Sequence, residues 1–307
     1  MIRLGYACIN MELREKNIYT SRTVRKKTFD EKGLQYVSNL CLNNVLDLIK
    51  ILKWNYENNI FVFRISSEMF PWASHYNIED LPDYENIARA LSIAGRYAQK
   101  TNQRLSFHPG QFNCLASSKE DVIKNSIIDL EIHAKLFDLM QLPKDHNSKI
   151  NIHLGSSDNG NLISAANNFC NNFDKLSDSV KSRLTIENDD KASMFSAKFL
   201  YENVYKNIGT PIVFDAHHFE LGPQDCSYEE SFIMSYETWK NIRPTFHYSN
   251  SRKIYEDTSC RVYTAHSDYY YKPFNFIKGN IDLMLESKCK EKSLIKYIND
   301  FNIPEFI

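Results

Sequence analysis

The sequence predicts an α/β fold of the TIM (β/α)8 barrel type, formed by a single domain over residues 1–307. Eight short apolar runs alternate with segments of helical periodicity, which is typical of parallel βαβ units, and eight such units close a barrel. The last six runs each end in His, Glu or Asp, and no linker or internal repeat divides the chain. Because the strand ends of such a barrel meet on one face, these side chains are expected to converge there.

The expected strands are short runs rich in Ile, Val, Leu and Phe, each bounded by polar or turn-forming residues. We place them at residues 2–7, 60–65, 103–107, 150–153, 184–187, 212–215, 244–247 and 262–266. The third run is the most informative, because it delivers His108 to a loop that begins at once with Pro109 and Gly110. The same order of strand, ligand-type residue and turn recurs in the runs that follow.

The helical segments lie between these runs. One of them, at residues 84–99, places Ile87, Ala90, Leu91, Ala94 and Ala98 on a single face, as a helix packed against a sheet requires. The expected helices cover residues 44–52, 84–99, 119–140, 162–173, 193–205, 228–239 and 274–286, with a terminal helix at 294–301.

Composition excludes several classes of protein. The charged fraction of 24% and hydrophobic fraction of 43% are ordinary for a globular domain, and a net charge of -1 gives no bulk attraction to nucleic acid. Seven scattered cysteines without a C-x-x-C pair suit free thiols in a reducing compartment. No signal peptide or membrane-spanning run is evident, so we expect the protein in the cytoplasm or with DNA. We also expect a monomer.

The ligand-type residues at the strand ends predict a metal site; they are His108, His153, Glu187, Asp215, His247 and His266. Imidazole and carboxylate without thiolate suit Zn, Mn, Fe or Co. Singly, each histidine is better explained as structural, but their joint position at strand ends is poorly explained by chance. Glu187 is central enough in the strand order to bridge two metals that activate water toward a phosphate. Spacing leaves open whether His217 or His218 reaches the metal.

Charge also favours a phosphate substrate. If three divalent metals bind, their charge exceeds that of Glu187, Asp215 and Glu286, and the mouth of the barrel becomes cationic although the chain is nearly neutral.

At this point the chain resembles a known family, the UV damage endonucleases, which are TIM-barrel relatives of endonuclease IV. The resemblance covers nearly the whole chain, and its motifs are specific jointly and in this order. They are Gly5-Tyr6 with Asn10, Arg64-Ile65-Ser66-Ser67-Glu68-Met69-Phe70-Pro71, Phe107-His108-Pro109-Gly110-Gln111-Phe112, His153-Leu154-Gly155, Glu187-Asn188-Asp189-Asp190, Asp215-Ala216-His217-His218, His247-Tyr248-Ser249 and Ala265-His266-Ser267-Asp268-Tyr269.

The resemblance implies a DNA repair endonuclease that cleaves the phosphodiester immediately 5′ of a UV photoproduct, with abasic sites as a second substrate, and leaves a 3′-hydroxyl. It implies two or three divalent metals, Mn²⁺ first, with Zn²⁺ or Co²⁺ as alternatives. By matching positions, His108, His153 and Glu187 hold the first metal, Glu187, Asp215, His247 and Glu286 the second, and His218 and His266 the third. The expected catalytic residues are the ligands of the first two metals: His108, His153, Glu187, Asp215, His247 and Glu286.

The resemblance also implies how damaged double-stranded DNA is bound. Gln111 and Phe112 are the expected wedge into the duplex, with Tyr6 and Asn10 beside the lesion. One departure concerns Thr245, where the family often has a lysine that supplies a ligand when carboxylated, so a third metal is less secure. The alternative function is a metal-dependent sugar isomerase or epimerase, since these enzymes share the barrel and its Glu/Asp/His site. The wedge and the number of histidines argue against it.

Overall fold

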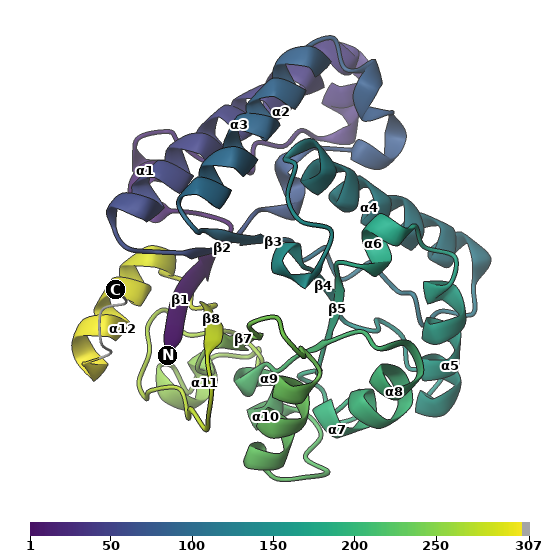
Figure 1. Ribbon diagram of the computed structural model, residues 1–307, viewed down its shortest axis with the longest axis vertical. Helices are drawn as coiled ribbons and strands as arrows, with labels where there is room; N and C mark the ends of the chain where they lie inside the picture. The colour runs from purple at the N-terminus through teal and green to yellow at the C-terminus, as the bar shows by residue number, and fades with distance from the viewer. Residues whose placement is uncertain (303–307) are drawn as a thin grey trace.

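Eight short parallel strands form a ring in the computed structural model, which describes residues 1–302 (Figure 1). Residues 303–307 of the predicted domain lie outside the described part. The strands are β1 Ile2–Ala7, β2 Val62–Arg64, β3 Arg104–Ser106, β4 Ile150–Ile152, β5 Leu184–Glu187, β6 Ile212–Val213, β7 Thr245–Tyr248 and β8 Ile281–Leu285.

Two sheets and two isolated bridges close this ring. One sheet has the order β3-β2-β1-β8-β7 and the other β4-β5-β6, and every pair is parallel. Parallel bridges join them, Phe107 with Ile150 between β3 and β4, and Asp215 with His247 between β6 and β7. The predicted TIM barrel is therefore confirmed, with all eight strands in sequence order around it.

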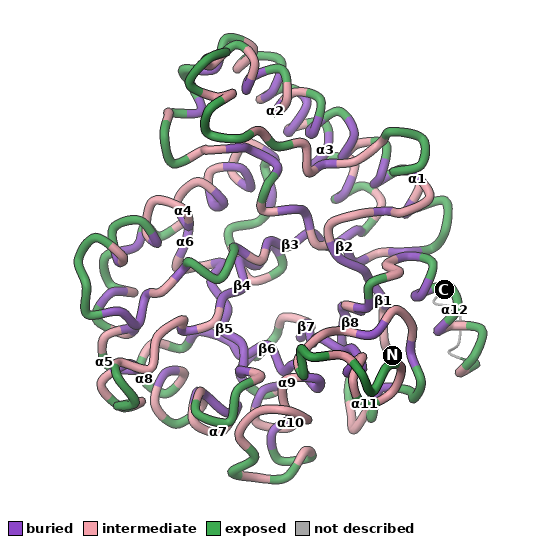
Figure 2. The backbone as a smooth tube through the Cα atoms, turned by 180° about the vertical axis from the view of Figure 1, so that it is seen from behind, coloured by how far each residue is buried: buried purple, intermediate pink, exposed green. Residues whose placement is uncertain are grey.

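The helices surround the ring, and Figure 2 shows that the strands inside are buried while green, exposed backbone lies on the periphery. They are α1 Met11–Glu15, α2 Lys26–Glu57, α3 Tyr84–Lys100, α4 Glu120–Leu139, α5 Leu162–Phe173, α6 Asp178–Lys181, α7 Ala197–Leu200, α8 Lys206–Ile208, α9 Ala216–Leu221, α10 Tyr228–Glu237, α11 Arg252–Tyr255 and α12 Lys290–Phe301.

Helix α3 illustrates why these segments are helical. All five residues of its predicted apolar face are buried, at 4% exposure or less, and α3 packs on both α2 and α4. Helix α2 is longer than expected and kinks at Gly33, whose positive φ of 64° a residue with a side chain rarely adopts. A π-helical turn, Tyr201–Tyr205, joins α7 to α8.

The last barrel unit corrects the sequence prediction. Residues 262–266, expected as strand eight, form a loop in which Val262 and Tyr263 are 59% and 52% exposed. The eighth strand is β8, inside the segment expected as a helix at residues 274–286. A short apolar run cannot be assigned to strand or buried helix by periodicity alone, which explains the error. Glu286 consequently follows a barrel strand directly.

No helix among residues 1–302 is both long enough and apolar enough to cross a membrane. The extent of the domain and the monomeric state stay predictions.

Candidate metal centre and active-site cavity

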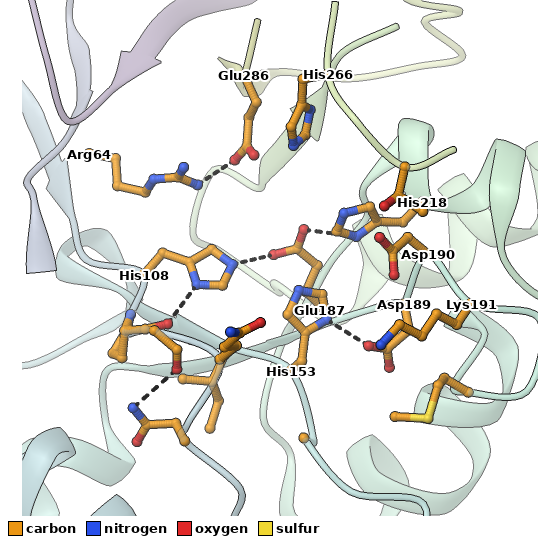
Figure 3. Close-up of a pocket in the computed structure, with 18 of the residues that line it drawn as sticks. Arg64, His108, His153, Glu187, Asp189, Asp190, Lys191, His218, His266 and Glu286 are labelled. Carbon is orange, nitrogen blue, oxygen red and sulfur yellow. Dashed lines mark hydrogen bonds and ion pairs between the residues drawn. The ribbon is translucent and has the colours of Figure 1, made fainter. Parts of the chain in front are cut away.

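A cavity of about 620 Å³ opens where the carboxyl ends of the strands meet. Most of the predicted metal ligands line it, from β3 around to β8, and Figure 3 shows them pointing toward one another. Its ligand-type residues are His108, His153, Glu187, Asp189, Asp190, His218, His266 and Glu286.

Glu187, the last residue of β5, lies at the centre of this cluster with 1% of its surface exposed. Its Oε2 is 3.2 Å from Nε2 of His108, and its Oε1 is 3.1 Å from Nδ1 of His247. The side-chain amide of Asn151, on neighbouring β4, donates a further hydrogen bond to it. Burial alone would raise the pKa of Glu187, but the surrounding histidines lower it well below its usual range. The carboxylate is therefore ionised and available as a ligand.

Two groups of three side chains meet closely enough to hold a metal ion, and Glu187 belongs to both. The first contains His108, His153 and Glu187, and the second contains Glu187, Asp215 and His247; within each group the ligand atoms lie within 4.8 Å of one another. The Oδ2 atom of Asp215 is buried without a hydrogen-bond partner, and burial raises the pKa of this carboxyl to about 6. An unpaired buried oxygen of this kind fits a cation.

Three of the histidines are held by their Nδ1 atoms. Nδ1 of His108 is 3.2 Å from the carbonyl oxygen of Pro109, and Nδ1 of His218 is 2.9 Å from that of Asn188. Nδ1 of His153 is 3.1 Å from Oδ1 of Asp189 (Figure 3). A proton on Nδ1 of His108 and of His218 satisfies the two carbonyl contacts and leaves Nε2 with its lone pair, the arrangement that orients metal-ligating histidines.

Glu286 and Arg64 form the rim of the cluster on the β8 and β2 side. Arg64 donates to the Glu286 carboxylate, which also lies 3.2 Å from Nδ1 of His247. Burial would raise the pKa of Glu286, yet the positive charge of Arg64 keeps it well below the usual range. Glu286 thus lies beside the second group, where its guanidinium partner would compete with a metal for one oxygen, and its role as a ligand stays a prediction.

The remaining predicted ligands are less closely grouped. Nε2 of His218 lies 3.8 Å from Oδ2 of Asp215, whereas Nδ1 of His266 contacts Oγ of Ser249. His266 is on the β7–β8 loop, its ring 4.9 Å from that of His217, and burial lowers its pKa to about 3. His217 is turned to the carbonyl of Thr264. Among the described residues, neither His218 nor His266 belongs to a group of three, so the third metal stays a prediction.

The predicted DNA-contacting residues divide into two pairs. Gln111 and Phe112 are exposed on the loop after β3, and Phe112 shows 84% of its surface. Tyr6 and Asn10 are fully buried, and this corrects their expected position beside the lesion. The Tyr6 hydroxyl donates to Asn55 and accepts from Asn10, which also caps α1, so both side chains are used within the core.

Sequence reasoning missed two residues of the site. Asp189, which holds His153, lies two positions after Glu187 in a motif already noted, but spacing did not reveal its partner. Lys149 is 1% exposed and places Nζ 3.3 Å from Nε2 of His247. Burial lowers its pKa to about 7. Alternation along β4 would have found it, because Lys149, Asn151 and His153 share one face of the strand.

Known proteins similar to this chain are UV-damage endonucleases. The family model described as UV-endonuclease UvdE matches residues 2–306. The UV-damage endonuclease of Schizosaccharomyces pombe is 34% identical over 316 residues, covering 98% of this chain and 51% of that protein. The UV DNA damage endonuclease of Clostridium perfringens is 32% identical over 305 residues, covering 97% of this chain and 70% of that protein. This chain thus spans about half the length of the yeast relative.

Solved structures agree. The crystal structure of SacUVDE has a TM-score of 0.85 and 31% identity, covering 98% of this chain and 99% of that one. A structure of L-ribulose 3-epimerase has a TM-score of 0.50 and 12% identity, covering 100% of this chain and 88% of that one, which is a similarity of fold alone. The match across almost the entire sequence, with relatives above 30% identity, shows that the chain belongs to the UV-endonuclease UvdE family.

Proposed function

We propose that this protein is a metal-dependent DNA repair endonuclease acting on UV-damaged double-stranded DNA. It hydrolyses the phosphodiester immediately 5′ of a photoproduct and leaves a 3′-hydroxyl, and abasic sites are a second substrate. Family membership supports the class of enzyme. The position of cleavage, the substrates and the metal requirement are our proposals.

One observation carries the proposal: two ligand groups share Glu187 in a cavity that Gln111 also lines, and the next residue, Phe112, has 84% of its surface exposed. An enzyme acting on a small molecule has no use for an exposed phenyl ring beside an open metal site. A duplex does, because a ring that stacks on a base stabilises an opened pair by roughly 1–3 kcal/mol, and damaged pairs cost least to open.

The donor set fits divalent metals. His108, His153 and Glu187 would hold one ion, and Glu187, Asp215 and His247, beside Glu286, a second. When bound, such a pair supplies Lewis acidity to a phosphate and a nucleophilic hydroxide at neutral pH. Imidazole and carboxylate ligands without thiolate are compatible with Mn²⁺, Zn²⁺ and Co²⁺. We propose Mn²⁺ first because the family resemblance implies it, with Zn²⁺ or Co²⁺ as alternatives.

The residues of this chain then have distinct tasks. Phe112 and Gln111 hold the distorted pair open and set the lesion strand over the cavity. Water attacks the phosphorus, the P–O3′ bond breaks, and the oxygen leaves as the 3′-hydroxyl after it gains a proton. Arg64 pairs with the Glu286 carboxylate and neutralises it, so that less negative charge opposes the incoming phosphate.

The test uses a duplex with one defined photoproduct and a label on the damaged strand. Purified protein, stripped of metal and supplied with Mn²⁺, should nick that strand at the bond 5′ of the lesion, and the product should be extended by a DNA polymerase, which requires a 3′-hydroxyl. An undamaged duplex of the same sequence is the control. Equal nicking of both duplexes, or none of either, would contradict the proposal.

The alternative, a sugar isomerase or epimerase, has the shared barrel in its favour. Incubating the Mn²⁺-loaded protein with ketohexoses and measuring interconversion tests it, and we expect no turnover above the rate of the metal alone.

A further inference from the structure

We propose that Arg261, Val262 and Tyr263, named here the β7–β8 prominence, form a second DNA contact that holds the undamaged flank of the duplex. This inference rests on the proposed function. It assigns to these residues binding of the duplex backbone outside the opened pair, without a role in the chemistry.

The prominence lies across the barrel mouth from Phe112. Phe112 follows β3, and the prominence follows β7, and these strands lie four positions apart in the eight-stranded ring in either direction. The two loops therefore leave the mouth from opposite sides. Thr264 and His266 line the same cavity as Gln111, so the prominence continues directly into the site. A duplex whose lesion lies at Phe112 extends across the cavity toward it.

The prominence belongs to a segment with several exposed hydrophobic side chains. Among residues 1–302, eleven large hydrophobic side chains are exposed, and four of them lie within residues 254–271: Ile254, Val262, Tyr263 and Tyr271. Scattered exposed apolar residues need no explanation, but a concentration beside an active site marks a surface that is covered in use.

The prominence is also held in place. The carbonyl of Tyr263 accepts a hydrogen bond from the hydroxyl of Ser251 at 2.9 Å, and that of Ala265 accepts one from the backbone N–H of Arg252 at 2.7 Å. An antiparallel bridge joins Ser251 to His266. A fixed backbone presents the side chains without an ordering cost on binding, which favours a contact surface.

Charge identifies the partner. Arg261 is exposed and forms no ion pair with the part of the chain that the structure describes, whereas nearby Arg252 is held by Glu256 and Asp268. The ammonium of Lys253 lies 6.0 Å from the centre of the Tyr263 ring. Asp257 is the exposed carboxylate nearby, and Ser259 donates to it. An exposed arginine without an ion pair, two residues from an aromatic ring that has an ammonium beside it, suits a phosphate and its neighbouring sugar better than an apolar protein surface.

The experiment measures the dissociation constant for an undamaged duplex as a function of salt, and incision of the single-lesion duplex. Arg261→Ala should reduce the slope of log K against log salt by about 1. Tyr263→Ala should raise the dissociation constant for the undamaged duplex, because it removes the ring that packs on the sugar beside the phosphate. Tyr263→Phe should retain binding, because the ring and not the hydroxyl makes the contact.

Matched controls lie away from the mouth. Arg96→Ala removes an exposed arginine of α3, and Tyr56→Ala removes a tyrosine that is 48% exposed near the end of α2, close to the start of β2; neither should alter binding. Incision by the wild type tests the proposed function separately. If the wild type incises and both prominence variants bind with wild-type affinity and salt slope, this inference is wrong and the surface is left to a protein partner. If the wild type does not incise, the proposed function fails first.

Discussion

The contact between Asp189 and His153 allows one part of the metal centre to be tested without measuring catalysis. Asp189→Asn keeps the size of the side chain and an oxygen that can accept the Nδ1 proton, but removes the negative charge 3.1 Å from that nitrogen. The change therefore separates the electrostatic effect of Asp189 from its place in the packing. Because His153 belongs to the first ligand group, the altered imidazole should change how that group binds metal.

The expected magnitude follows from the pKa of His153. Burial lowers it, but Asp189, Glu187 and Asp215 outweigh burial and raise it to about 9 in the metal-free protein. Relative to an ordinary 6.5, this is a preference of roughly 3 kcal/mol for the protonated form, at about 1.4 kcal/mol per pH unit. Asp189 shares this with two carboxylates, so its replacement should lower the pKa by about one unit.

Two measurements follow. His153 must lose its proton to bind metal, so wild-type Mn²⁺ affinity should rise with pH until about 9, while Asp189→Asn should reach its plateau near pH 8. Above both values the variant should still bind roughly 10- to 100-fold more weakly, because its imidazole is less firmly oriented. In the metal-free fold, protonated His153 contributes stability that is complete below pH 6.5 and lost as pH rises through 9. The variant should lose less stability over this window.

Calorimetric titration with Mn²⁺ and NMR titration of His153 supply both readouts. Asp190→Asn is the matched control, since this neighbouring carboxylate lines the same cavity and, within the described residues, forms no ion pair with His153. An unchanged His153 pKa in Asp189→Asn, or an equal shift in Asp190→Asn, would refute the reasoning.

Three further predictions concern the proposed reaction. Removal of metal with a chelator should abolish incision, and Mn²⁺, Co²⁺ or Zn²⁺ should restore it to different extents; full activity of a verified metal-free preparation contradicts the mechanism. Glu187→Gln should lower incision by roughly 1,000-fold or more, because one amide replaces the anion common to both ligand groups, while damaged DNA still binds; unchanged metal content and near-wild-type cleavage would exclude the bridging role. Phe112→Ala should weaken incision of a lesion duplex roughly 5- to 150-fold and leave metal content and thermal unfolding unchanged, since the ring is 84% exposed; equal incision under recognition-limited conditions would show that it is not the wedge.

Seven of the eight barrel strands could be predicted from the sequence, because each is a short apolar run bounded by polar or turn-forming residues. The eighth strand could not be recognised in this way. Residues 262–266 have the side chains of a strand but form a loop with Val262 and Tyr263 exposed, whereas the apolar segment that contains β8 was expected to be a helix. What decides between them is the partner: β8 pairs with both β1 and β7, and that pairing is a property of the closed ring. The local sequence pattern does not indicate this strand pairing.

The site residues likewise fall into those that the local sequence pattern could place and those that it could not. Residues that end a strand, such as Glu187, could be placed because strand direction fixes where their side chains go. Tyr6 could not, since its alternation along β1 does not say whether it faces the cavity or Asn55. Lys149 is the clearest example of a site residue whose partner depends on the closed ring. Position 245 of β7 is a threonine, yet Lys149, just before β4, places Nζ 3.3 Å from Nε2 of His247. An amine therefore reaches this part of the barrel from β4, three strands away from β7, and only the folded ring brings the two strands together.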